Sequence, residues 1–575
     1  MAMEIPEYLL EMLDNGWQRL CATIPQPNSY DLLGTESSPW KPLVNEKGVI
    51  TIETQFTPPD IQPDVFAGVR RTLLTLFAPE HLGFGTFVKP ISHECLDGWL
   101  PATSLRFRTS RFPDLHELAF VDGDNSLLVR LTADTETAYY RVFLPTETDP
   151  RRLWNMPDPQ PEQLPDGKRF DAGLARLRHH WTSEFTPLFP RLPSHPLLRN
   201  AVLSAFAKSF LTQYDGGMRY GATRYYCDDG RCAESFPPTI FTMISASLHY
   251  GLEKKALPFL GRFLDFFVSE KGELLHRGNG ASLSEHGMLL DLFGLITDAD
   301  FRRKYSPAVE LVAERLLRLV QKAGDGLIAC CPEDDVRDCP PRQWFSCNLW
   351  VARGLLSHFR VHTYETQGVP RVAVKGEPPL SGDQANSALA REFAKRTVRI
   401  CRESAIATRD GLFVPPSPDW RKPFADMNDF VPFMPKDDIH SIASYTNYRF
   451  YPEMLSSGLL PPDLASAIVQ YRRGHGGDFH GATAFRIFRD YPPYARCLDD
   501  WPVSNLLVGL AHYGDYREFI RILCGHLALH QSRGTFFAPE MSFRDRLDST
   551  HCVPSQLTVP LALQAMETAC FRLQV

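Results

Sequence analysis

Carboxylates and aromatic rings gather in a few segments of this sequence, and together they suggest sugar chemistry. Two pairs of adjacent acids, Asp228-Asp229 and Asp499-Asp500, and the single acid Glu540 stand close to tyrosine, tryptophan and phenylalanine. Aromatic rings stack on pyranose faces, and paired carboxylates can protonate a glycosidic oxygen while activating water or attacking the anomeric carbon. We therefore predict Glu540, Asp500 and Asp229 as catalytic residues. Asp228 and Asp499 are alternatives for the acid that faces Glu540.

Other polar and aromatic residues of the same segments are predicted to bind the substrate. They are Tyr226, Asp228, Glu285, His286, Trp344, Asp438, His480, Asp499, Trp501 and Arg533. Structural roles compete with some of these assignments. Asp-Asp-Gly at 228–230 also fits a surface turn, and one acid of 499–500 also fits a helix N-cap, because Pro502 marks a helix start. His286 also fits a hydrogen-bonded core histidine, and Glu540 a loop acid that caps a helix.

From about residue 171 the sequence predicts two kinds of helix that alternate. One kind has a single apolar stripe, as in 301–322, which indicates one buried and one wet face. The other kind carries almost no charge, which indicates burial on all sides. Uncharged helices are predicted at 237–250, 286–296, 345–359, 441–455, 503–513 and 553–570. Six outer–inner pairs predict an (α/α)6 toroid, and the alternative is an open helical solenoid.

Apart from 360–385, the long connections of this region run from outer to inner helices. They are 214–234, 271–285, 323–342, 405–440, 474–500 and 531–550. Long loops in a compact domain are usually functional, and these precede the N-termini of the inner helices. A closed ring would bring them to one face. The predicted site residues lie on these loops or at the helix starts that follow.

The N-terminal part differs from the helical region. After a short helix near 5–20, β-type runs at 116–121, 126–132 and 137–144 predict an antiparallel meander. We predict a β-rich domain over 1–150, a proline-rich linker over 151–170 and the barrel over 171–575. The β-rich unit is expected to pack near the mouth of the barrel.

The runs MRYGATRYYCDDGRCAESFPP, HYGLEKK and GELLHRGNGASLSEHGMLLDLFGLITDADF resemble the six-hairpin glycosidase superfamily over roughly residues 190–575. Trehalase-like, glucoamylase-like and rhamnosidase-like enzymes belong to it. The resemblance implies an (α/α)6 barrel and a general base supplied by a glutamate of the last long loop, here Glu540. It indicates no specific family, and the sugar, the linkage and the anomeric outcome stay open.

No metal or cofactor is expected. Cys330-Cys331-Pro332 is similar to the double cysteine of the zinc-binding, cysteine-dependent arabinofuranosidases, but the Glu-x-Cys that those enzymes also need is absent between 170 and 330. Cys227 and Cys232 have no second pair of ligands nearby. The thirteen scattered cysteines are typical of reduced thiols rather than of a disulfide framework.

Composition narrows the function further. A net charge of −7 argues against nucleic acid or an anionic membrane as partner. No apolar stretch reaches the roughly 18 residues of a membrane span, and the N-terminus lacks a signal-peptide pattern, so a cytoplasmic protein is expected. A glycoside hydrolase acting on a small or oligomeric sugar is the leading hypothesis. A sugar epimerase, isomerase or lyase using His or Tyr, or a repurposed biosynthetic barrel, is the alternative, and the oligomeric state is open.

Overall fold

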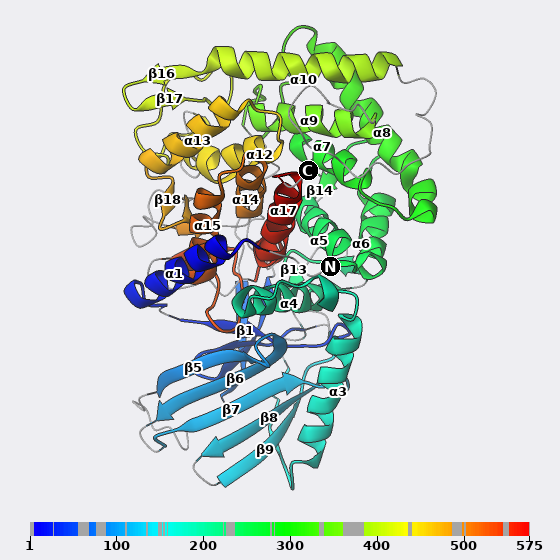
Figure 1. The fold of residues 1–575 in the computed structure, drawn as a ribbon. Coiled ribbons are helices and arrows are strands. Elements are labelled where there is room, and N and C mark those ends of the chain that lie inside the picture. Colours follow the sequence, from blue (N-terminus) through cyan, green and yellow to red (C-terminus); the bar gives the residue numbers. More distant parts are fainter. Residues whose placement is uncertain are drawn as a thin grey trace. The chain divides into compact units, whose positions relative to one another are not determined.

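The computed structural model of the chain is drawn in Figure 1. It describes residues 5–26, 28–38, 40–55, 68–75, 88–109, 112–133, 136–147, 152, 156–157, 159–214, 216–221, 224–225, 236–276, 279–280, 282–332, 339–359, 384–434, 440–485, 497–499, 502–543 and 551–573. Backbone contacts divide the chain into two compact units. The first comprises Met1–Glu4, Trp17–Glu234 and Leu527–Pro560, and the second Ile5–Gly16, Ser235–His526 and Leu561–Val575. The domain limits predicted from the sequence remain a prediction.

The first unit contains the predicted β-rich part. Its described residues form an antiparallel sheet in the order β10-β9-β8-β7-β6-β5. The bounds are β5 (Val88–Leu96), β6 (Leu100–Thr109), β7 (Leu115–Val121), β8 (Ser126–Ala133), β9 (Glu136–Phe143) and β10 (Glu162–Leu164). Strands β7, β8 and β9 are the predicted meander, which is confirmed. Successive antiparallel strands joined by short turns need no crossover, as the blue strands of Figure 1 show.

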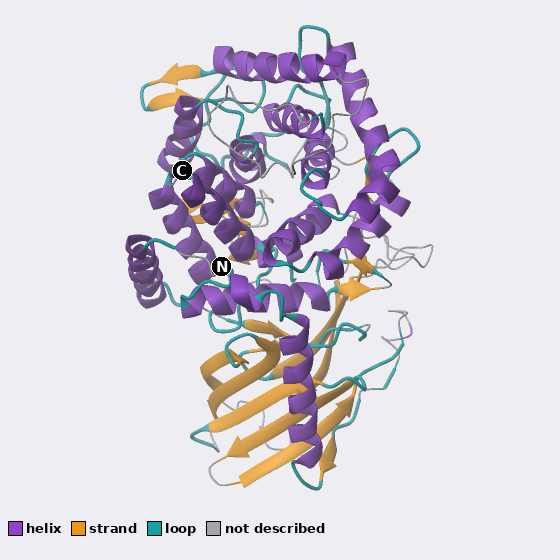
Figure 2. Cartoon of the chain, turned by 45° about the vertical axis from the view of Figure 1, so that its right-hand side comes forward, coloured by secondary structure: helices purple, strands orange, loops and turns teal. Residues whose placement is uncertain are grey.

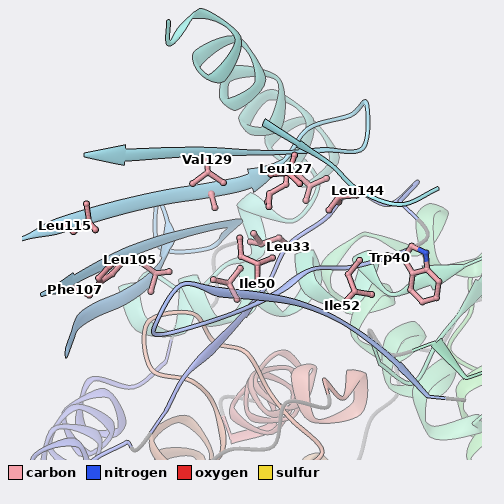
Figure 3. Packing of buried hydrophobic residues seen from close by; sticks show 14 residues of the cluster. Leu33, Trp40, Ile50, Ile52, Leu105, Phe107, Leu115, Leu127, Val129 and Leu144 are labelled. Atoms are coloured by element: carbon pink, nitrogen blue, oxygen red, sulfur yellow. The ribbon is translucent and has the colours of Figure 1, made fainter. Parts of the chain in front are cut away.

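A second sheet of the first unit faces this one. It joins β1 (Tyr30–Leu32), β2 (Leu43–Asn45), β3 (Val49–Gln55), β4 (Gly68–Thr75) and β13 (Arg224–Tyr225). Leu33, Trp40, Ile50 and Ile52 pack with apolar side chains of β6–β9 into one buried cluster (Figure 3). Helices α3 (Lys168–Glu184) and α4 (Pro196–Leu211) also belong to this unit. The strands alternate apolar and polar side chains, and burial of the apolar ones in this cluster stabilises the two sheets.

One acid lies inside this apolar core. Glu117, in the middle of β7, is in register with Leu105 of β6 and Leu131 of β8. Its side chain is 0% exposed, and neither carboxylate oxygen has a hydrogen-bond partner within the described part of the chain. Burial raises its pKa to about 8, because an apolar core disfavours the charged form.

We expect Glu117 to make stability depend on pH. The unfolded carboxyl titrates near 4.5 and the folded one near 8, so the folded chain binds an extra proton between these values and loses stability as the pH rises through them. The gain in stability from Glu117→Met should therefore be about 3 kcal/mol larger at pH 7 than near pH 4.5. Urea unfolding between about pH 5 and 8 measures the difference, and a gain that does not vary with pH would refute it.

The second unit consists mainly of paired helices. The inner helices are α5 (Pro237–Tyr250), α7 (Leu283–Phe293), α9 (Phe345–His358), α11 (Ile442–Tyr445) continuing through η3 (Thr446–Phe450) to α12 (Tyr451–Ser456), α14 (Val503–His512) and, from Leu561, α17 (Thr558–Leu573). The outer helices are α6 (Glu253–Phe266), α8 (Ala299–Ala323), α10 (Gln384–Ser404), α13 (Pro462–Gly474) and α15 (Tyr516–Gly525). Among the described residues, no helix has the length and apolar character that crossing a membrane requires.

Contacts between these helices follow the predicted alternation. Along the inner row α5 contacts α7, α7 contacts α9, α9 contacts α12 and α12 contacts α14, while α6, α8 and α10 form an outer row. Figure 2 shows the two rows of helices in this unit. The outer helices bury one stripe and the inner ones are buried nearly throughout, as the charge pattern predicted. The mainly α fold class, an (α/α)6 toroid preceded by a β-rich part, is confirmed.

Two inner helices are interrupted where single helices were predicted, and α7 begins and ends three residues earlier than the predicted 286–296. The fourth is not uniformly α-helical, because Thr446–Phe450 forms a π-helical turn. The last is divided into α16 (Val553–Gln556) and α17, and proline stands in the first turn of each, at 554 and 560. Proline is favoured in a first helical turn, where its missing N–H has no partner to lose. Both irregular segments adjoin predicted site loops.

Candidate active site

Glu540 follows a tightly folded turn of the last long loop. The Ser532 N–H donates to the Phe537 carbonyl and the Phe536 N–H to the Ser532 carbonyl, both at 2.8 Å. Phe536 has φ 55°, a left-handed conformation that bulky residues rarely adopt. Strained backbone of this kind persists only where surrounding contacts enforce it, and it is often found at functional sites. The Glu540 side chain is partly exposed at the end of this turn.

The first long loop lies against the last one. The Val553 N–H donates to the Tyr220 carbonyl at 2.7 Å. A Cβ on Gly221 would stand 1.9 Å from the carbonyl oxygen of His551, so only glycine permits this approach. Burial and, next, the charge of Glu540 raise the pKa of the Cys552 thiol. The Glu540 carboxylate is thus close to the point where the two loops meet.

The acids predicted to face Glu540 are described incompletely. Asp499 ends the short strand β20 (Cys497–Asp499), of which the structure describes only the backbone at this position. Other predicted residues lie outside the described residues: Tyr226, Asp228, Asp229, Asp438, Asp500 and Trp501. The catalytic pair and these substrate contacts therefore remain predictions.

Glu285 and His286 stand at the start of α7 with their polar atoms bonded within the protein. Ser282 and Glu285 form a capping box, in which Glu285 accepts from the Ser282 N–H at 3.0 Å. The His286 ring bonds the Ser282 carbonyl at 2.8 Å and accepts from the Leu274 N–H at 3.0 Å. Burial lowers its pKa to about 4, so it is neutral near pH 7. The core-histidine interpretation agrees with these bonds, and substrate contact stays a prediction.

Three further predicted substrate contacts differ in their surroundings. Trp344, the N-cap residue of α9, is fully buried. His480 is exposed in the turn between β18 (Asp478–Phe479) and β19 (Ala482–Phe485) with φ 53°. The Arg533 guanidinium donates to the carbonyls of Ala528, Cys21 and Ile24 at 3.0, 3.3 and 2.6 Å. Arg533 thus anchors the last loop to the N-terminal segment of the first unit.

An aromatic cluster joins three of the long loops in the second unit. The Trp344 ring lies 4.9 Å from Phe450 and 5.8 Å from Phe433 between centroids. Tyr445 contacts Phe433 at 5.1 Å and Phe485 at 5.8 Å. Trp344 follows the third long loop, Phe433 and Phe485 lie in the fourth and fifth, and Tyr445 and Phe450 belong to the fourth inner helix. Aromatic rings from three of the long loops and their borders thus meet in this part of the second unit.

A buried ionic network connects α7 with the fourth inner helix, and the sequence did not predict it. Arg449 contacts Glu285 at 2.9 Å and Glu453 at 2.8 Å, and all three are at most 3% exposed. Burial raises the pKa of Glu453, which Arg449 partly offsets. The available signal was the charge itself, since Arg449 and Glu453 are the charged residues of the inner segment 441–455 and stand four apart. Within the described residues, no three His, Cys, Asp or Glu side chains are grouped to hold a metal.

Comparisons with known proteins give a likeness only among solved structures. No family model matches the chain, and no curated protein matches it. A D-mannose isomerase aligns with TM-score 0.42 and 12% identity over 66% of this chain and 98% of its own. An unsaturated glucuronyl hydrolase specific for heparin aligns with TM-score 0.37 and 11% identity, over 66% and 97%. A GH76 α-mannanase of Bacteroides thetaiotaomicron aligns with TM-score 0.38 and 10% identity, over 69% and 100%.

Proposed function

We propose that this chain is a sugar-processing enzyme, a glycoside hydrolase that acts on a small or oligomeric sugar. The observation that carries the proposal is the placement of Glu540. Its carboxylate is partly exposed at the end of a strained turn, next to the first long loop. That loop continues into Asp228 and Asp229, which we propose together with Asp499 and Asp500 as the source of the second acid.

The chemistry follows from having two carboxylates in different surroundings. One, protonated, gives its proton to the glycosidic oxygen as the bond to the anomeric carbon breaks. The other, ionised, activates water or attacks that carbon. Phe536 and Phe537, four and three residues before Glu540 in the sequence, are buried. Apolar surroundings favour the protonated form of a carboxyl group, which is the form that the acid needs.

The alternative is an epimerase or isomerase that removes a carbon-bound proton with histidine. Burial lowers the pKa of His286 to about 4 and of His551 to about 3, so both are poor bases at neutral pH. His440 is partly exposed and lies 6.1 Å from Tyr445 between ring centroids. This His–Tyr pair is the observation that would support proton abstraction, and a lyase would need the same groups.

A substrate screen separates the two functions. We expect the chain to hydrolyse an aryl glycoside or a natural disaccharide, with the anomer of the first product identified by NMR. Incubation with free aldoses and ketoses in deuterated water tests the alternative. Interconversion of free sugars with deuterium incorporation, in the absence of any hydrolysis, would contradict the hydrolase proposal.

A further inference from the structure

Gln556, the last residue of α16, forms hydrogen bonds with two backbone groups of the loop that carries Glu540. Its Nε2 donates to the Phe536 carbonyl at 2.6 Å, and its Oε1 accepts from the Ala538 N–H at 2.9 Å. The same Oε1 lies 3.2 Å from Nε2 of His551. The Gln556 side chain is fully buried, so each of these bonds is made away from bulk water.

The two backbone partners determine how the amide is oriented. A carbonyl can only accept and an N–H can only donate, so Nε2 must face Phe536 and Oε1 must face Ala538. Because Oε1 only accepts, the proton of His551 resides on its Nε2. Burial lowers the pKa of His551 to about 3, so the ring stays neutral and this arrangement does not change across the physiological range.

The hydrogen bonds of Gln556 hold the short backbone segment that leads to Glu540 and orients its side chain. The left-handed Phe536 lies on one side, and the isolated bridge between Pro539 and His551 on the other. The Cys552 N–H also donates to the Ala538 carbonyl at 3.0 Å. Glu540 follows directly after the bridge. Through these contacts one amide holds the strained turn, the bridge and the histidine in a single geometry.

We propose that Gln556 is the positioning residue for Glu540, which it aligns through the 536–539 segment without touching the substrate. This inference rests on the proposed function of Glu540. Displacement of a catalytic group by about 1 Å costs on the order of 10² in rate. Gln556→Met, which keeps the length of the side chain and removes all three hydrogen bonds, should therefore lower kcat by about 10²-fold, with a smaller effect on KM.

The same loop offers a matched control. Gln531 is also a fully buried glutamine, but neither of its amide atoms has a hydrogen-bond partner within the described part of the chain. Removing an amide that makes no such bond is close to neutral, whereas removing a partner leaves a buried group unsatisfied. Gln531→Met should leave kcat, KM and the pH profile as in the wild type.

The experiment measures two independent properties of both variants in the full chain. Hydrogen exchange by NMR or mass spectrometry reports the amide of Ala538, which should exchange at least about 10-fold faster in Gln556→Met alone. Steady-state kinetics use the aryl glycoside or disaccharide that the wild type hydrolyses. The apparent pKa that Glu540 contributes to the pH profile of kcat/KM should also shift. A loss of folded protein would lower the whole profile without shifting this pKa. Gln556→Glu keeps the acceptor oxygen for Ala538 and can donate to the Phe536 carbonyl only when its buried carboxyl is protonated. It serves if Gln556→Met does not fold, with a smaller and pH-dependent fall in kcat expected.

The outcomes separate the two proposals. Faster exchange at Ala538 with unchanged kcat and pH profile would overturn the positioning role of Gln556, provided that Glu540→Gln is impaired. Unchanged turnover in both Glu540→Gln and Gln556→Met would instead refute the function proposed for Glu540. Unchanged exchange at Ala538 in Gln556→Met would overturn the hydrogen-bond geometry on which the inference stands.

Discussion

Glu540→Gln should lower turnover by roughly 10²–10⁴-fold and leave the fold intact. Glutamine keeps the shape of the side chain but can neither transfer a proton as an acid nor hold a negative charge. Glu540 is partly exposed, and its neighbours are fixed by backbone hydrogen bonds, so the substitution removes chemistry rather than packing. The measurement is kcat on the hydrolysed substrate, with circular dichroism and Tm as checks of folding.

Glu253→Gln is the control for this experiment. Glu253 is partly exposed as well, but it begins the outer helix α6, after a short inner-to-outer connection. Its replacement should leave turnover unchanged. Near-normal activity of Glu540→Gln on the same substrate would remove Glu540 from the mechanism. A loss in both variants would point to a general effect of charge.

Lys208→Met should destabilise the first unit by about 3–5 kcal/mol. The Lys208 ammonium lies 2.6 Å from the Asp31 carboxylate, and both side chains are 0% exposed. Burial raises the pKa of Asp31, and Lys208 counteracts this, while Asp31 in turn raises the pKa of Lys208 despite its burial. We regard the two as an ion pair, because Asp31 also accepts from the Leu32 N–H at 2.9 Å. Methionine would leave the carboxylate unpaired in the interior, and urea unfolding measures the cost.

Two variants test whether the cost comes from the unpaired charge. The double variant Lys208→Met with Asp31→Leu removes both charges and should recover most of the lost stability. Arg178→Met breaks an exposed pair with Asp97, in which both side chains are more than 40% exposed, and should cost less than about 1 kcal/mol. If the double variant were as unstable as Lys208→Met, packing rather than electrostatics would explain the loss.

The sequence predicted the periodic parts of the fold well. Charge alone distinguished α8, with its single stripe, from α5, which has almost no charge, and alternation identified β7 to β9. Both signals arise because burial acts on many side chains in a regular pattern. Lys208 shows where such reasoning fails. A single lysine near the end of an apolar helix is normally expected to be exposed to solvent. Its buried partner Asp31 is far away in the sequence.

The candidate site was harder to predict than the fold. Site residues come from separate loops, and no periodicity links Glu540 to Tyr220 or Gln556, which lie beside one turn only because of the fold. Arg449 was missed because an inner helix was expected to exclude charge. His286 illustrates the reverse, since the sequence permitted two roles and only its two backbone partners favour the structural one.

The order in which a ribosome makes the chain bears on how the first unit can assemble. The Thr535 carbonyl accepts from the Cys95 thiol and the Ser204 hydroxyl, both at 3.2 Å. Thr535 belongs to Leu527–Pro560, which is made only after all of Ser235–His526. At roughly 5–20 residues per second this takes on the order of 15–60 s. During that interval the nascent sheets lack the segment that completes their polar interior, so we expect them to remain protease-sensitive on stalled ribosomes until residue 560 has emerged.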